Sequence, residues 1–248
     1  AIPMASGDET ESSTKSAVAD GTITIRNKEQ QKQNIENFTM NDLKGKTIIG
    51  GRKGGVPAMT LQYTIEEAGL EIGTGENKVN LRTDVAFDLT ASVFDSTDAD
   101  FCTLFEPTAS ELCKEKGYHI VSSVGLLSGE VPYTAFTAKR GYLDDNPLIA
   151  EKFLRAVYRG YRFLLKASVE DIAKSLKPSF NAVSDESIVK SIQSYIESDA
   201  WTQSPVMTEE SFNRLQDIVI NAGELNNKVS FNSVVDTVIA QKVVDYFM

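Results

Sequence analysis

"LKGKTIIGGRKGGVPAMTLQYTIEEAG" (residues 43–69) combines a short apolar run, a glycine-rich turn and the start of a helix, and it decides the fold of this chain. Gly45-Lys46-Thr47 looks like the end of a phosphate-binding P-loop. That motif needs another glycine five residues earlier, where this sequence has Met40, and it follows its strand, whereas here it precedes the apolar run 47–49. The candidate ligand site is therefore the second glycine cluster, residues 50–55.

The second glycine cluster, Gly-Gly-Arg-Lys-Gly-Gly, joins a strand to a helix in which Pro57 suits the first turn. Such a turn presents backbone N–H groups at a helix N-terminus, where partial positive charge attracts anions. The guanidinium of Arg52 adds a planar donor that suits a carboxylate, sulfonate or phosphate. The alternative is a turn that is only tight, with solvated cations. The turn residues predicted to contact a ligand are Gly51, Arg52, Gly54 and Gly55.

Three later side chains are also candidates for the site. Glu106 follows the buried, strand-like run 99–105, and Ser128 and Tyr133 come after a second strand-like run, 118–124. Ligands of open α/β sheets sit at the carboxyl ends of strands, so we predict that all three face the same crevice as the glycine turn. The alternatives are that Glu106 only stabilises the N-terminus of the next helix and that Tyr133 only packs.

Composition excludes several classes of protein. The 248 residues include 25 basic and 35 acidic side chains, and the net charge of −10 argues against a nucleic-acid partner. No run approaches the roughly 18 apolar residues of a membrane-spanning helix. With one histidine, His119, and two cysteines, Cys102 and Cys113, at no metal-ligand spacing, we predict no metal and no cofactor. Both cysteines are expected to be reduced, buried thiols.

Hydrophobic periodicity divides the chain into two parts. Up to about residue 135, strand-like and helix-like runs alternate, which predicts a parallel α/β sheet with right-handed crossovers. After Tyr142 amphipathic helices dominate. The predicted strands are 22–26, 47–50, 78–82, 99–105 and 118–124. The predicted helix caps in the second part are Asn146, Ser168, Ser184, Thr208 and Asn232.

The first twenty residues differ from the rest because they are small, polar and without an apolar face. Such a segment buries too little surface to offset its ordering entropy, so residues 1–20 are expected to form a flexible tether. A tether of this kind is common after the lipidated cysteine of exported lipoproteins.

An ordered set of short motifs resembles a known family. The set resembles the substrate-binding proteins of ABC importers, in the branch that captures nitrate, aliphatic sulfonates, taurine and thiamine-pyrimidine precursors. The motifs are residues 42–46, 50–52, Pro57, 105–109, 123–125, 128–129, 132–134, Asn146-Pro147, 152–156 and Trp201.

The resemblance implies an α/β, periplasmic-binding-protein-like (type II) fold, with ligand held between two lobes joined by a hinge. It implies that residues 42–135 form the second lobe and that 136–248 form the hinge and the helical C-terminal part of the first lobe. Residues 21–41 would then be a remnant of the first lobe. That remnant is too short for half a lobe, so one wall of the cleft is expected to be lacking.

The resemblance also implies a function. We expect an extracytoplasmic solute-binding protein, at the cell surface or in the periplasm and lipid-anchored, that passes an anion, sulfonate, zwitterion or pyrimidine to an ABC permease. One alternative is an enzyme similar to thiamine-pyrimidine synthases, which the single histidine and unclustered cysteines disfavour. The other is a truncated interaction or scaffold protein without capture activity that dimerises through an exposed partial lobe.

Overall fold

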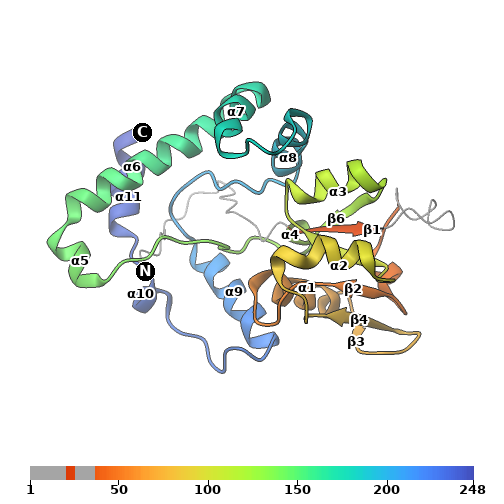
Figure 1. Ribbon diagram of the computed structural model, residues 1–248. Coiled ribbons are helices and arrows are strands. Elements are labelled where there is room, and N and C mark those ends of the chain that lie inside the picture. Colours follow the sequence, from red (N-terminus) through yellow and green to blue (C-terminus); the bar gives the residue numbers. More distant parts are fainter. Residues whose placement is uncertain (1–20, 26–36) are drawn as a thin grey trace.

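The structure is a computed structural model, and it describes residues 21–25 and 37–248. The tether predicted for residues 1–20 lies outside this range. The described part contains one six-stranded sheet, in the order β3-β4-β2-β5-β1-β6, covered by helices (Figure 1). Its strands are β1 (Thr22–Ile25), β2 (Thr47–Ile49), β3 (Glu71–Ile72), β4 (Lys78–Arg82), β5 (Phe101–Leu104) and β6 (His119–Ser123).

The helices fall into two groups. Near the sheet lie η2 (Met40–Leu43), α1 (Val56–Glu67), η3 (Phe87–Leu89), α2 (Thr90–Ser96), α3 (Thr108–Lys116), α4 (Val124–Ser128) and α9 (Glu209–Asn221). The others are α5 (Arg140–Asp145), α6 (Pro147–Leu164), α7 (Val169–Leu176), η4 (Lys177–Ser179), α8 (Asp185–Glu197), α10 (Phe231–Val234) and α11 (Val238–Phe247). No helix of the described ranges is both long enough and apolar enough to cross a membrane.

The sheet is mixed, which corrects the prediction of an entirely parallel sheet. Strands β2, β3, β4 and β5 pair in parallel, but β1 lies between β5 and β6 and is antiparallel to both. The prediction that residues 21–41 are a remnant of the first lobe is therefore wrong for β1, which is an inner strand of this sheet. Periodicity missed this because a buried strand carries no mark of its direction or of its neighbours in space.

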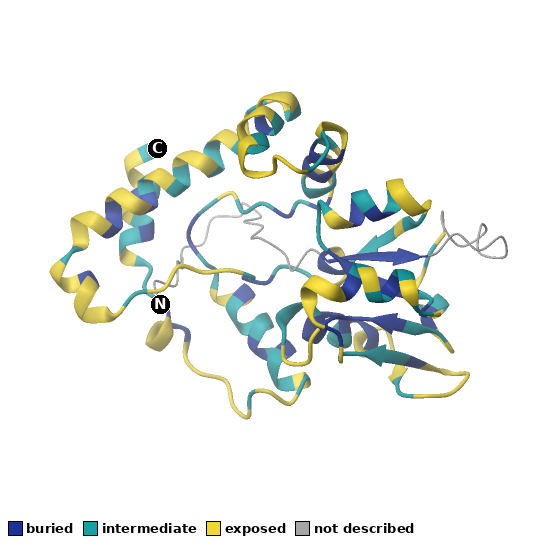
Figure 2. Ribbon diagram, in the orientation of Figure 1, coloured by how far each residue is buried: buried dark blue, intermediate teal, exposed yellow. Residues whose placement is uncertain are grey.

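Packing on both faces explains why β1 is entirely buried. Ile23 and Ile25 point into a cluster with Ile48 and Phe101, beneath α1. The next residue of β2, Ile49, points to the opposite face, into a cluster with α2 and α3, as the alternation of a strand requires. Figure 2 shows β1 and most of β2 buried between helices with exposed outer surfaces.

Helices α5, α6 and α11 form an arm that stands apart from the sheet (Figure 1). Helix α6 packs along α11 and leads back to α7 and α8, and α8 contacts α3. The caps predicted at Ser168, Ser184 and Thr208 are confirmed, since each accepts a hydrogen bond from the N–H three residues on. The cap predicted at Asn232 is wrong, because α10 starts one residue earlier, after Ser230.

Asn146 occupies the predicted N-cap position of α6, but its side chain donates a hydrogen bond to the carbonyl of Tyr142 instead. Neither Cys102 nor Cys113 forms a disulfide, and the predicted burial holds for Cys102 but not for Cys113, which is half-buried. Burial raises the pKa of the Cys113 thiol to about 11, and the Glu106 carboxylate adds to this.

Gly45, which gave the sequence its P-loop appearance, has a structural role. Its φ is +70°, and a Cβ there would lie 2.8 Å from the carbonyl oxygen of Glu76. We predict that Gly45→Ala lowers the free energy of unfolding by about 1–3 kcal/mol, because the backbone would be both strained and crowded. Urea unfolding measures the loss. Gly160→Ala, in α6 with open space at its Cβ, is the control and should leave stability unchanged or raise it.

Glu151 joins the two main helices of the arm. It is 7% exposed and forms an ion pair at 2.6 Å with Lys242 of α11. It also forms an ion pair with Arg155, whose guanidinium stacks on the ring of Tyr246. The hydrogen bond from Lys242 lowers the pKa of Glu151 from its ordinary value of 4.5. A lowered carboxyl pKa stabilises the fold above the unfolded value, and this stabilisation is lost as pH falls through the folded value.

We therefore predict that Glu151→Gln destabilises the protein more at pH 7 than in acid below the lowered folded pKa of Glu151, where the wild-type carboxyl is also protonated. Urea unfolding of both proteins at each pH gives the difference. Glu197→Gln, at an exposed position on α8, is the matched control. An equal effect of Glu151→Gln at both pH values would show that the ion pairs contribute nothing.

Candidate functional site

A groove of about 530 Å³ opens where the glycine turn meets the loop after β4. Its walls come from three parts of the chain: residues 51–58, residues 86–88, and residues 133–134 on the segment that leads toward the arm. The carboxyl ends of β2 and β4 and the N-terminus of α1 thus meet at one place, as predicted for an open α/β sheet.

Local backbone contacts fix the shape of the glycine turn. Gly50 is buried, and a Cβ there would lie 2.8 Å from the side chain of Leu81. Gly51 has a φ of +94°, so the chain turns sharply just before Arg52. The N–H of Lys53 then donates to the carbonyl of Thr83 at 2.9 Å, which ties the turn to the end of β4.

The turn leaves hydrogen-bond donors available at the groove. Gly55 is the N-cap of α1, and its own N–H donates a hydrogen bond to the carbonyl of Arg52 at 3.0 Å. The N–H groups of Val56 and Ala58, which line the groove, belong to the first turn and have no acceptor within the helix. The side chain of Arg52 is exposed and forms no ion pair with any described residue. The groove therefore offers the Arg52 guanidinium and oriented amides, which suit an anion, and the side chain of Asp88 also lines it.

An aromatic row forms the other side of the groove. The ring of Phe105, at the end of β5, stacks on Tyr133 with centroids 5.6 Å apart and contacts Phe87 at 5.2 Å. Phe87 is 57% exposed. Burial raises the pKa of the Tyr133 hydroxyl, so this group remains a neutral hydrogen-bond donor. The row provides an apolar surface beside the cationic turn.

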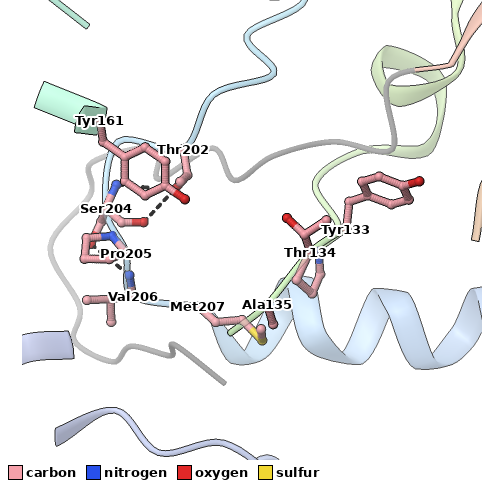
Figure 3. Close-up of a pocket in the computed structure, with 10 residues that line it drawn as sticks. Tyr133, Thr134, Ala135, Tyr161, Thr202, Ser204, Pro205, Val206 and Met207 are labelled. Carbon is pink, nitrogen blue, oxygen red and sulfur yellow. Dashed lines mark hydrogen bonds between the residues drawn. The ribbon is translucent and has the colours of Figure 1, made fainter. Parts of the chain in front are cut away.

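Tyr133 and Thr134 also border a second, small hollow. It holds about 50 Å³ between residues 132–135, the side chain of Tyr161 and residues 202–207. Figure 3 shows these segments facing each other, with the Thr202 hydroxyl bonded to the carbonyl of Ser204. The groove therefore adjoins the place where the two segments between sheet and arm come together.

The structure brings only part of the predicted site together. Gly51, Arg52, Gly55 and Tyr133 line the groove. Gly54 instead faces the carboxylate of Glu224, 3.6 Å from its Cβ position.

Ser128 is buried in α4, where its hydroxyl donates to the carbonyls of Gly125 and Gly129. Its role at this groove is not supported, because a Ser in the last turn of a short helix bonds to nearby backbone.

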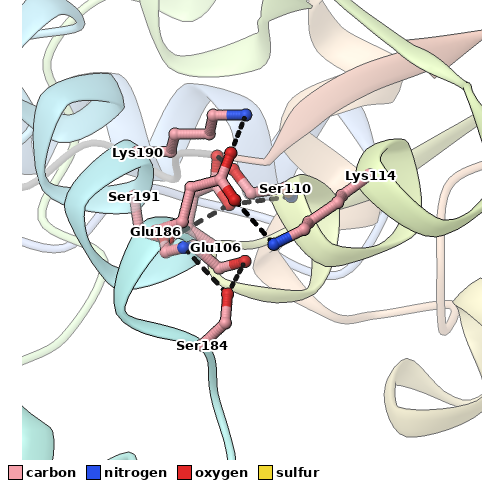
Figure 4. A network of polar contacts seen from close by, with 8 residues as sticks. Glu106, Ser110, Lys114, Ser184, Glu186, Lys190 and Ser191 are labelled. Carbon is pink, nitrogen blue, oxygen red and sulfur yellow. Dashed lines mark hydrogen bonds and ion pairs between the residues drawn. The ribbon is translucent and has the colours of Figure 1, made fainter.

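Glu106 lines a different cavity from the groove. Its carboxylate accepts hydrogen bonds from the N–H and hydroxyl of Ser110, each at 3.0 Å, and from the hydroxyl of Ser191 at 3.4 Å. Figure 4 shows this carboxylate beside the ion pairs that link Lys114 and Lys190 to Glu186. The prediction that Glu106 shares a crevice with Arg52 fails because Glu106 lies in the turn after β5, where its carboxylate accepts from Ser110 of α3 and Ser191 of α8.

Sequence analysis missed Phe87 as a groove residue and Phe105 as the ring that packs against Phe87 and Tyr133. Phe105 belongs to the motif 105–109, but Glu106 was chosen from this motif as the site candidate because of its carboxylate. Phe87 lies in a 3-10 turn between β4 and α2, where the sequence gives no periodic signal.

The sheet order and the groove at its strand ends define a lobe of the periplasmic-binding-protein class. Two solved structures share this fold. The nitrate-binding protein NrtA from Synechocystis PCC 6803 matches with a TM-score of 0.65 and 15% identity, covering 93% of this chain and 66% of its own. The alkanesulfonate-binding protein SsuA from Xanthomonas axonopodis pv. citri, bound to MOPS, matches with a TM-score of 0.63 and 16% identity, covering 90% and 71%.

The chain belongs to the NMT1-like family, whose profile matches residues 12–176. A relative, YtlA of Bacillus subtilis (strain 168), whose name classes it among binding proteins, is 35% identical over 225 residues. The match covers 90% of this chain and 65% of YtlA, so the chain spans less than two thirds of the length of that relative. The family resemblance inferred from the motifs is thereby confirmed.

The same fold also occurs in an enzyme. The desulfurization enzyme DSZB matches with a TM-score of 0.56 and 14% identity, covering 94% of this chain and 72% of its own. Fold alone therefore does not separate binding from catalysis. Within the described ranges no group of three or more His, Cys, Asp or Glu side chains is placed to hold a metal ion.

Proposed function

We propose that this protein is the solute-binding component of an ABC importer, acting outside the cytoplasm, and that its solute is a small anion with an apolar body. The observation that carries the proposal is the groove itself. The exposed Arg52 and the first turn of α1 line it together with the rings of Phe87 and Tyr133, and Phe105 stacks on Tyr133. Family membership supports a binding role, and a lipid anchor and a permease partner are part of the proposal.

The groove narrows the choice of solute that the sequence left open. The zwitterion was expected to contact Arg52 and Glu106 in one site, but these two residues line different cavities, and the acidic residue that lines the groove with Arg52 is Asp88. A sulfonate suits the groove best, because its charged oxygens can accept from Arg52 while its carbon body lies against the rings. Nitrate has no carbon body, so it would contact only the part of the groove formed by Arg52 and the α1 amides.

We predict that Arg52→Ala raises the Kd for MOPS by about tenfold or more, since a charged hydrogen bond contributes ~1.5–3 kcal/mol. The titration is done at alkaline pH, where the morpholine nitrogen of MOPS is unprotonated and the molecule is an anion. Isothermal titration calorimetry measures this. Lys53→Ala removes the adjacent exposed cation, which does not line the groove, and is the matched control. If both variants weaken MOPS equally, the attraction is only long-range charge, and Arg52 does not contact the solute.

A second pair of variants tests the aromatic side. Tyr133→Ala removes the stack and should weaken MOPS about fivefold, because an aromatic contact contributes ~1 kcal/mol. The same change should leave nitrate binding almost unaltered. Tyr133→Phe keeps the ring and should bind MOPS as the wild type does. Loss of both ligands in Tyr133→Ala, with normal thermal stability, would contradict the division of the groove into two halves.

The enzyme alternative is separated by product analysis. A binding protein gains thermal stability when its solute is added and releases the solute unchanged. An enzyme converts the solute into a product. Incubation with sulfonates, followed by mass spectrometry of the small molecules, distinguishes these outcomes.

A further inference from the structure

We propose that the outer surface of the arm docks on a membrane that carries anionic lipids. This surface is formed by one side of α6 and the neighbouring side of α11, which pack along each other (Figure 1). The inference goes beyond solute binding and does not depend on which solute the groove takes. Two features carry it: a stripe of basic side chains along α6, and large apolar side chains exposed next to that stripe.

The cationic stripe consists of five basic side chains that recur at alternating intervals of three and four residues. This spacing keeps them on one side of a helix, because one turn takes 3.6 residues. At a rise of 1.5 Å per residue, the stripe is about 20 Å long. Its members are Lys152, Arg155, Arg159, Arg162 and Lys166, the last of them just past the end of α6.

Most of the charge in the cationic stripe has no acidic partner. Lys152, Arg159 and Lys166 are exposed and form no ion pair with any residue of the described ranges. Arg162 donates to the backbone carbonyl of Phe247, which carries no charge. Arg155 is the member that pairs with an acid, the buried Glu151.

This positive charge is confined to one part of the molecule. The chain has a net charge of −10, yet residues 139–166 and 238–248, which contain the arm, hold eight basic and four acidic side chains. The arm stands apart from the sheet (Figure 1), and salt screens charges that are more than about 8–10 Å apart. An anionic surface that meets the arm is therefore attracted, although the protein as a whole is acidic.

Large apolar side chains are exposed beside the cationic stripe, and Figure 2 shows exposed positions along α6. The side that packs on α11 uses Ala150 and Leu154 instead, so the exposed groups are not needed for that contact. Three of the exposed side chains lie one helical turn from a member of the stripe, and the fourth lies under the guanidinium of Arg155. They are Leu148 (65% exposed), Ile149 (55%), Phe163 (42%) and Tyr246 (61%).

This combination fits the headgroup region of a membrane better than it fits other partners. Anionic headgroups attract Lys and Arg, whose aliphatic stems can lie along the acyl boundary that Leu, Ile and Phe enter. A small soluble anion would meet only one or two cations of a stripe about 20 Å long. A second copy of the chain, joined to the first by two-fold symmetry through α6, would place one cationic stripe against the other.

The test is co-sedimentation of the full chain with two kinds of vesicle. One contains phosphatidylcholine alone, and the other contains equal parts of phosphatidylcholine and phosphatidylglycerol. We expect binding to the anionic vesicles to be about tenfold or more stronger, and to weaken between about 50 mM and 500 mM NaCl. Equal binding to both vesicles, or binding to neither, overturns the proposal. Displacement by polyglutamate at the same charge concentration would assign the surface to an acidic protein and overturn it too.

A charge-reversal pair tests whether the arm is the surface that docks. Lys152→Glu with Arg159→Glu should lower binding to the anionic vesicles about tenfold or more. Lys44→Glu with Lys53→Glu reverses two exposed cations on the sheet side and is the matched control, which should bind almost as the wild type does. An equal loss in both pairs would mean that only net charge matters, and it would overturn the assignment to the arm.

A second pair tests the apolar contribution. Leu148→Ser with Ile149→Ser should remove the vesicle binding that remains at high salt, while the attraction at low salt is retained. Unchanged binding at high salt would contradict the role of these side chains. Both arm variants should keep the thermal stability of the wild type and its affinity for MOPS, so a failure of this proposal leaves the proposed solute binding untouched.

Discussion

The antiparallel pairing of β1 between β5 and β6 is the constraint on which the rest of the structure depends. All four residues of β1 are buried, and Thr22 donates its hydroxyl hydrogen to the carbonyl of Leu104 at the end of β5. Without this strand, β5 and β6 would each lose a partner. Because β1 fixes β5, it also fixes the residues that immediately follow β5, and the aromatic row beside the groove begins there.

The end of β5 supplies residues to two different surroundings. Phe105 and Glu106 are adjacent in sequence, yet the first joins the aromatic row of the groove and the second joins the cavity beneath α8. The turn that follows β5 thus sends an apolar ring and a carboxylate to different neighbours over one residue. The glycine turn with Arg52 lies on the side of Tyr133 and Phe87.

Much of the fold could be predicted from the sequence. Strand β4 has the predicted bounds, and the glycine turn lies at a groove because a strand, glycines and Pro57 dictate a local geometry. The position of β1 could not be predicted, since its pairing joins residues about 80 positions apart in the chain (Thr22 with Leu104). The prediction that Glu106 faces the groove failed for a related reason, because a motif identifies a residue but not the direction of its side chain.

The burial and the pKa of the two thiols determine how the chain responds to an oxidising environment. Cys102 is completely buried, and Cys113 has a pKa of about 11, so very little thiolate exists at neutral pH. Oxidants attack the thiolate rather than the thiol, and access is required as well. An oxidising environment would therefore leave both sulfur atoms unmodified for as long as α3 stays packed, and the fold would need no disulfide there.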